Sequence, residues 1–148
     1  MNFQYENVIF REAAKSEIDL VVSLFNLATI NLSDNKTVYL AVLLDKNKSC
    51  HVELVIGFLE ISFVLEQCDI VNFEIKEEFR AKGIGTRFLK YAIFDIKSKG
   101  IKEIFLEVRK SNLAAIKLYK KMGFDEIDVR KDYYKNPTED AIIMKGKI

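Results

Sequence analysis

The sequence could bind an anionic ligand at a short glycine-containing segment between a predicted strand and a predicted helix. The segment reads Arg80-Ala81-Lys82-Gly83-Ile84-Gly85-Thr86. Glycine lets the backbone approach a ligand closely, and the free N–H groups at a helix N-terminus attract anions. Arg80 and Lys82 add positive charge. The segment therefore predicts an anion-binding loop, unless its glycines serve only to make a tight strand-to-helix turn.

Two familiar nucleotide-binding loops do not fit this segment. A P-loop requires Gly-Lys followed by Ser or Thr, which is absent. A dinucleotide-binding fingerprint requires a third glycine where Phe88 stands, and Glu107 is only a partial match to its downstream acid. Both the P-loop and the dinucleotide-binding loop are therefore disfavoured.

A possible proton acceptor lies in the next predicted strand, Glu103 to Val108. Alternation places one set of side chains on each face of the strand, namely Ile104, Leu106 and Val108 against Phe105, Glu107 and Arg109. A partly desolvated Glu107 carboxylate could take a proton from an amine. The alternative is an ion pair with Arg109 or a neighbouring lysine.

Further polar and aromatic candidates follow this strand. Asn112, Ala115 and Tyr119 are spaced three and four residues apart, so they share one stripe of a predicted helix. Tyr119 is either a functional hydroxyl or an interfacial core aromatic. Tyr133 and Tyr134 precede the last predicted turn, where they either bind a ligand or pack in a strand.

The first half of the chain predicts strands and one helix. A strand at Val8 to Arg11 precedes a helix with Ser16 as N-cap, and residues 31–36 form a loop or short helix. Val38 to Leu44 and Val52 to Val64 predict an antiparallel hairpin, which Asp69 to Ile75 extends.

The second half changes to a helical period. A helix over Gly85 to Lys99 connects the strand ending at Ile75 to Glu103–Val108, which should run parallel to it. A helix over Leu113 to Met122, capped by Ser111 or Asn112, leads to a hairpin of Phe124–Tyr134 and Asp140–Lys145. Because no boundary interrupts these elements, we expect one α/β (α+β) domain over residues 1–148.

Composition narrows the class of protein. The chain has 148 residues, 49% hydrophobic and 30% charged, with a net charge of +1. No large basic field is available for nucleic acid or an anionic membrane, and no apolar run reaches the ~20 residues of a membrane helix. Cys50, Cys68 and His51 lack the spacing of a metal site, and reduced thiols are favoured over a disulfide. We therefore expect a cytoplasmic protein without a metal.

The segments around these candidates resemble the GNAT acetyltransferase superfamily. The resemblance rests on Arg-x-x-Gly-x-Gly after a strand, then Leu106-Glu107-Val108-Arg109 and Asn112-Leu113-Ala114-Ala115, and then Leu118-Tyr119 and Met122-Gly123-Phe124. It also includes Arg130-Lys131-Asp132-Tyr133-Tyr134. Within the superfamily the match is to ribosomal-protein-alanine N-acetyltransferases, over roughly residues 72–144. The first half lacks the Pro-Trp-Ser type segment of these enzymes, and the chain has no tryptophan.

The resemblance implies a fold and a cofactor. The fold is a mixed, mostly antiparallel sheet in which two central parallel strands splay apart around acetyl-CoA. The pyrophosphate would lie on Arg80 to Thr86, and the pantetheine arm on Phe73 and Ile75, with Asn112 hydrogen-bonding it and Ala115 leaving it room. Coenzyme A is the product.

The resemblance also implies the catalytic roles and the acceptor. Glu107 would be the general base and Tyr119 the general acid in direct transfer, while Asn72, Tyr133 and Tyr134 would bind the acceptor. Protein N-terminal α-amino groups are the expected acceptors, ribosomal-protein alanine among them. A small amine (polyamine, aminoglycoside or amino acid) and a non-catalytic acetyl-CoA-binding module remain alternatives.

Overall fold

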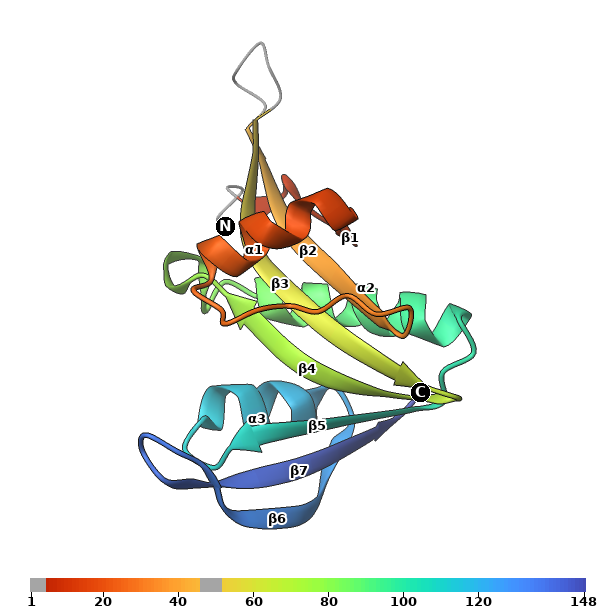
Figure 1. Ribbon diagram of the computed structural model, residues 1–148, viewed down its shortest axis with the longest axis vertical. Coiled ribbons are helices and arrows are strands. Elements are labelled where there is room, and N and C mark those ends of the chain that lie inside the picture. The colour runs from red at the N-terminus through yellow and green to blue at the C-terminus, as the bar shows by residue number, and fades with distance from the viewer. Residues whose placement is uncertain (1–4, 46–51) are drawn as a thin grey trace. The chain divides into compact units, whose positions relative to one another are not determined.

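A computed structural model describes residues 5–45 and 52–148 (Figure 1). In these residues a seven-stranded sheet with the order β1-β2-β3-β4-β5-β7-β6 is accompanied by three α-helices. The expected mixed sheet with a central parallel pair is confirmed. Contacts within the chain divide it into two interleaved units: residues 5–45, 52–61 and 72–92 form the first, and 62–71 and 93–148 the second.

The first unit contains the N-terminal strands. β1 (Val8–Glu12) pairs antiparallel with β2 (Lys36–Asp45), from Val8 opposite Leu43 to Glu12 opposite Tyr39. β3 (Val52–Val64) is the next strand, and its residues 52–61 belong to this unit. The unit also holds the end of β4 (Gln67–Ile75) and the start of α2 (Ile84–Ser98), with a 3-10 turn at Glu77–Phe79 between them.

Helix α1 (Ile18–Leu24) covers one face of this part of the sheet and follows a 3-10 turn at Lys15–Glu17. Its apolar stripe ends in Phe25, whose ring lies 4.7 Å from that of Phe58. The predicted N-cap, Ser16, is wrong, because Ser16 lies inside the 3-10 turn. Glu17 closes the turn instead, accepting hydrogen bonds from Ala14 N and from the Arg11 guanidinium, each at 2.8 Å. Residues 31–33 form a loop.

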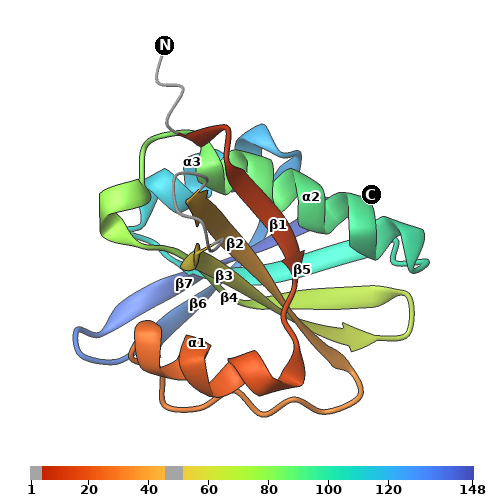
Figure 2. The same ribbon diagram turned by 90° about the horizontal axis from the view of Figure 1, so that it is seen from above.

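Helices α1 and α2 lie on opposite faces of β1 and β2, as Figure 2 shows. Aromatic rings fill that interface in the first unit: Phe88 stacks on Phe10 at 5.1 Å, and Tyr91 meets Tyr39 edge-on at 6.1 Å. α2 begins at Ile84, one residue earlier than predicted. Ile84, Gly85 and Thr86 therefore form its first turn.

The second unit contains the parallel pair. β4 and β5 (Glu103–Arg109) pair in parallel register from Gln67 opposite Glu103 to Ile70 opposite Leu106. β7 (Glu139–Lys147) runs antiparallel to β5 and also pairs with β6 (Phe124–Tyr134). The predicted alternation of β5 is confirmed, since Ile104, Leu106 and Val108 share the buried face.

Helix α3 (Leu113–Lys121) follows β5 and contacts β6 in the second unit. Asn112 is its N-cap, and the side-chain Oδ1 accepts a hydrogen bond from Ala115 N at 3.2 Å. Of the two predicted N-caps, Ser111 and Asn112, the helix therefore uses Asn112. The described residues include no helix long and apolar enough to cross a membrane.

Candidate active site

The glycine-containing loop has the backbone of an anion-binding turn. Ala81 and Gly83 both have positive φ, +57° and +76°. Residues 80 and 81 form a turn, and the successive N–H groups of a turn can form a concave site for anions. A Cβ at Gly83 would meet no atom within 4 Å, so the space above the loop is open.

The start of α2 supplies further donors. The hydrogen bond from Arg87 N to Gly83 O, at 3.2 Å, is the first of the helix. The earlier N–H groups of the first turn have no acceptor within the helix, so they point out of its end. The predicted residues Ile84, Gly85 and Thr86 carry these groups. This geometry fits a pyrophosphate.

The basic side chains of the loop hold it to the end of β4. Arg80 Nε donates to Ile75 O at 2.7 Å, and its guanidinium lies 3.6 Å from Glu74. Lys82 donates to Glu78 O. Both side chains are exposed and retain donors for a ligand.

The other cofactor and acceptor candidates in the first unit have structural contacts. Phe73 is half-buried and meets Phe88 edge-on at 5.8 Å. Asn72 is exposed, and its Nδ2 donates to Glu60 at 2.7 Å. Glu60 is a buried acid whose other oxygen lies 3.0 Å from Lys36 Nζ, so it orients the Asn72 amide.

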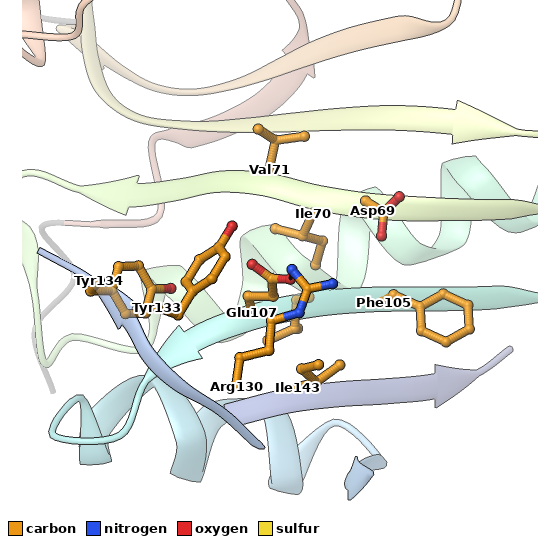
Figure 3. A pocket seen from close by; sticks show the side chains of 10 residues that line it. Asp69, Ile70, Val71, Phe105, Glu107, Arg130, Tyr133, Tyr134 and Ile143 are labelled. Atoms are coloured by element: carbon orange, nitrogen blue, oxygen red, sulfur yellow. Dashed lines mark ion pairs between the residues drawn. The ribbon is translucent and has the colours of Figure 1, made fainter. Parts of the chain in front are cut away.

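The catalytic candidate Glu107 lines a pocket of about 530 Å³ in the second unit. Figure 3 shows the side chains around it, which come from β4, β5, β6 and β7. They are Asp69, Ile70, Val71, Phe105, Leu106, Glu107, Arg130, Tyr133, Tyr134 and Ile143. The volume is within the usual range for ligand sites.

Glu107 itself is held by two groups from β6. Arg130 Nη1 lies 2.7 Å from Glu107 Oε1. The Tyr133 hydroxyl also hydrogen-bonds this carboxylate, and this bond raises the pKa of Tyr133. The sequence had suggested Arg109 as an ion-pair partner, but Arg109 pairs with Glu139 at 3.3 Å and lies 4.3 Å from the Tyr134 ring centroid.

An irregular stretch of β6 after Arg130 brings both tyrosines to the pocket that Arg130 already lines. From Arg130 to Tyr134 the chain advances four residues, while the partner strand advances only two, from Ala141 to Glu139. Asp132 has a left-handed backbone with φ +51°, and its N–H donates to Asp140 Oδ1 at 3.0 Å. In a regular strand the adjacent residues Tyr133 and Tyr134 would point to opposite faces. The irregularity places both beside Glu107.

A second carboxylate, Asp69, faces the same pocket from β4. Burial raises the pKa of Asp69, and the nearby Glu107 charge raises it further. Desolvation likewise raises the pKa of Tyr134, with the Glu107 charge adding to it. Asp69 and Tyr134 therefore hold their protons more tightly than they would in water.

The three candidates on α3 differ in their surroundings. Tyr119 is 6% exposed and packs on Phe124 with 5.6 Å between ring centroids. Burial raises the pKa of Tyr119, so its hydroxyl stays protonated at neutral pH. Asn112 is exposed and caps the helix through Oδ1, which leaves its Nδ2 as a donor, and Ala115 is half-buried.

Sequence reasoning missed Asp69 and Arg130 as members of the site. The register of β4 and β5 puts Asp69 opposite Phe105, on the same face as Glu107. Asp69 could be recognised only from the register between β4 and β5, which cannot be read from the sequence. In the described residues no group of three or more His, Cys, Asp or Glu could hold a metal ion. Cys68 is a free, buried thiol; Cys50 and His51 lie outside the described residues.

Comparisons with known proteins agree with this geometry. The sequence model of the acetyltransferase (GNAT) family matches residues 6–124, and the chain belongs to that family, whose members use acetyl-CoA. The [ribosomal protein bS18]-alanine N-acetyltransferase of Haemophilus influenzae is 40% identical over 93 residues, 61% of this chain and 63% of that protein. A putative enzyme of the same name from Bacillus subtilis is 39% identical over 88 residues, 60% of this chain and 58% of that protein.

A solved structure shows the same fold. The ribosomal-protein-S18-alanine N-acetyltransferase from Escherichia coli has a TM-score of 0.80 and 22% identity, covering 95% of this chain and 94% of that chain. The sequence matches span less than two thirds of the length of the curated relatives. The predicted family and fold are thus confirmed.

Proposed function

We propose that this protein transfers an acetyl group from acetyl-CoA to the N-terminal α-amino group of a protein, such as the N-terminal alanine of a ribosomal protein. The observation that carries the proposal is the pocket around Glu107. In a chain of the GNAT family, it combines the predicted base with two tyrosines and enough volume for the first residues of a peptide. The relatives named as bS18-alanine N-acetyltransferases support the choice of acceptor.

Each candidate residue has a part in this proposal. The loop from Arg80 to Thr86 would hold the pyrophosphate of acetyl-CoA. Phe73 and Ile75 would offer backbone groups to the pantetheine arm, which Asn112 and Ala115 would also contact. Acetyl-CoA supplies an activated thioester. Asn72, Tyr133 and Tyr134 would bind the acceptor.

Glu107 would take the proton that the attacking amine releases. Its resting partner Arg130 is 55% exposed, and an exposed ion pair is worth about 1 kcal/mol or less. An incoming amine can therefore replace Arg130 at low cost. General base catalysis by a positioned carboxylate contributes about 10²–10⁴ in rate.

Tyr119 would give its proton to the departing sulfur. A hydroxyl must be protonated to act as an acid, and burial keeps that of Tyr119 protonated at neutral pH. Because the helix holds the ring against Phe124, the position of this hydroxyl is fixed in the second unit.

The test is acetyl transfer by the purified protein. Peptides that begin with Ala-Arg are compared with the same peptides carrying a blocked N-terminus and with a panel of polyamines, aminoglycosides and amino acids. We expect acetylation of the free N-terminus only. Turnover of a small amine but of no peptide would refute the protein acceptor, and acetyl-CoA binding without any turnover would favour a non-catalytic module.

A cellular measurement identifies the acceptor. Mass spectrometry of protein N-termini from cells with and without this protein should show at least one N-terminus that loses its acetyl group. An unchanged set of N-termini would contradict the proposal.

A further inference from the structure

The acceptor pocket holds two carboxylates on neighbouring strands. Asp69 and Glu107 point to the same side of the parallel pair, as Figure 3 shows. Paired residues of parallel strands share a face, so Asp69 opposite Phe105 is a diagonal neighbour of Glu107, two residues further along β5. The charge of Glu107 acts on Asp69 across this distance.

The two carboxylates differ in their partners. Glu107 has the Arg130 guanidinium and the Tyr133 hydroxyl. Asp69 is exposed at the wall of the pocket and has no hydrogen bond or ion pair with any residue in the described ranges. The titratable or charged groups that line this pocket with Asp69 are Glu107, Arg130, Tyr133 and Tyr134. Of these only Arg130 is a cation, and it pairs with Glu107.

The Asp69 carboxylate is thus available to a cation that enters the pocket. A carboxylate that a bound ligand shields from water is stabilised when that ligand is a cation that donates hydrogen bonds. A divalent metal is a poor candidate, because the described residues offer only two carboxylates here and one of them is paired with a guanidinium. An ammonium group carries one charge and three donors, and it fits beside a single aspartate.

We propose that Asp69 binds the ammonium form of the acceptor and takes its first proton. This inference rests on the acetyl transfer proposed above, and it divides the proton transfers between two carboxylates. An α-amino group has a pKa of about 8, so most acceptor molecules arrive protonated at neutral pH. The protonated nitrogen has no lone pair with which to attack.

The proton balance gives each carboxylate one step. Asp69 takes one proton from the ammonium, which leaves a neutral amine. The nitrogen then bonds to the thioester carbon and gives a second proton to Glu107. The C–S bond breaks, and the sulfur takes a proton from Tyr119. One of the two nitrogen protons restores Tyr119, and the other is released to solvent.

The experiment compares Asp69→Asn with Asp125→Asn, a control on the exposed part of β6 outside the pocket. Asparagine keeps the shape of Asp69 but cannot hold a cation or take a proton. At pH 6.5 we expect kcat/KM for the acceptor to fall about 10- to 100-fold, as for the loss of a charge-assisted hydrogen bond. The KM for acetyl-CoA should not change.

The pH profile separates this role from a structural one. Above pH 8 the acceptor is mostly a neutral amine, so the gap between Asp69→Asn and the wild type should narrow. A loss of equal size at every pH, or no larger than in Asp125→Asn, would overturn the inference.

The acceptor in this experiment is whichever amine the wild-type protein acetylates fastest. Turnover of small amines alone would refute the peptide acceptor yet still test Asp69. Turnover of no amine would overturn both proposals.

Discussion

Replacing Glu107 by glutamine removes the proposed base and alters little else. The side chain keeps its length and an acceptor oxygen for the Tyr133 hydroxyl, and the ion pair with Arg130 is lost. That pair is exposed, so its loss costs about 1 kcal/mol or less. For a domain of this size, such a cost lowers Tm by about 4 °C at most. Loss of a general base lowers kcat by about 10²–10⁴.

The assay follows coenzyme A release by thiol detection at saturating acetyl-CoA, with acetyl-CoA affinity measured separately by calorimetry. We expect kcat to fall at least about 100-fold in Glu107→Gln while affinity and Tm stay near wild type. The pKa of Tyr133 should also fall toward its ordinary value, because the carboxylate that raises it is gone.

Glu103→Gln is the matched control for this experiment. Glu103 lies four residues before Glu107, on the same strand and face, and it does not line the pocket. The substitution removes the ion pair of Glu103 with Lys145, 2.6 Å long in the wild type, just as Glu107→Gln removes the pair with Arg130. Its kcat should be unchanged. A kcat of Glu107→Gln within twofold of the wild type, or an equal loss in both variants, would refute the assignment of Glu107 as base.

Three further changes test other parts of the structure. Tyr119→Phe keeps the packing on Phe124 and should lower kcat by about 100-fold with little change in Tm; an unaltered kcat would exclude the proposed acid. Gly83→Ala places a Cβ at φ +76°, which costs about 1 kcal/mol, and should weaken acetyl-CoA binding measured by calorimetry; unchanged affinity would separate the loop from the cofactor. The Arg11 guanidinium holds the pKa of Glu17 at about 2, below its ordinary 4.5, so this carboxylate stabilises the fold above about pH 4.5 and the effect is lost as pH falls toward 2. Glu17→Gln should therefore lower the free energy of unfolding in urea by about 1 kcal/mol at pH 7, with the difference shrinking at pH 3; an equal difference at both would contradict the pair's role.

Local patterns were sufficient for several elements. The alternation of β5 predicted which side chains share a face, because successive side chains of a strand point to opposite sides. The glycine-containing loop and the start of α2 were also local, since positive φ and a helix N-terminus have direct sequence signals. The start of α1 could not be predicted from local patterns. Arg11 on β1 pairs with Glu17, and this tertiary contact decides where the 3-10 turn before α1 ends.

The pocket required knowledge of pairing. Asp69 and Glu107 are far apart in the sequence, and only the register of β4 and β5 makes them neighbours. Arg130 and Arg109 both pair with Ala141 of β7, so Arg130 lies on the same face as Glu107 by ordinary strand pairing. The irregular stretch after Arg130, where Asp132 N–H donates to Asp140 Oδ1, adds both tyrosines to the pocket. The candidate base could be chosen from a motif, whereas its partners depend on contacts between strands.

The irregular stretch of β6 also determines how this pocket could be remodelled. It contains two residues more than the paired stretch of β7. Deleting two residues, Asp132 and Tyr133, would remove this irregularity and keep the remaining pairs in register. The hairpin would survive, but the pocket would lose a tyrosine and the hydrogen bond to Glu107. Insertions and deletions here, rather than point substitutions, offer a route by which this scaffold could exchange one acceptor for another.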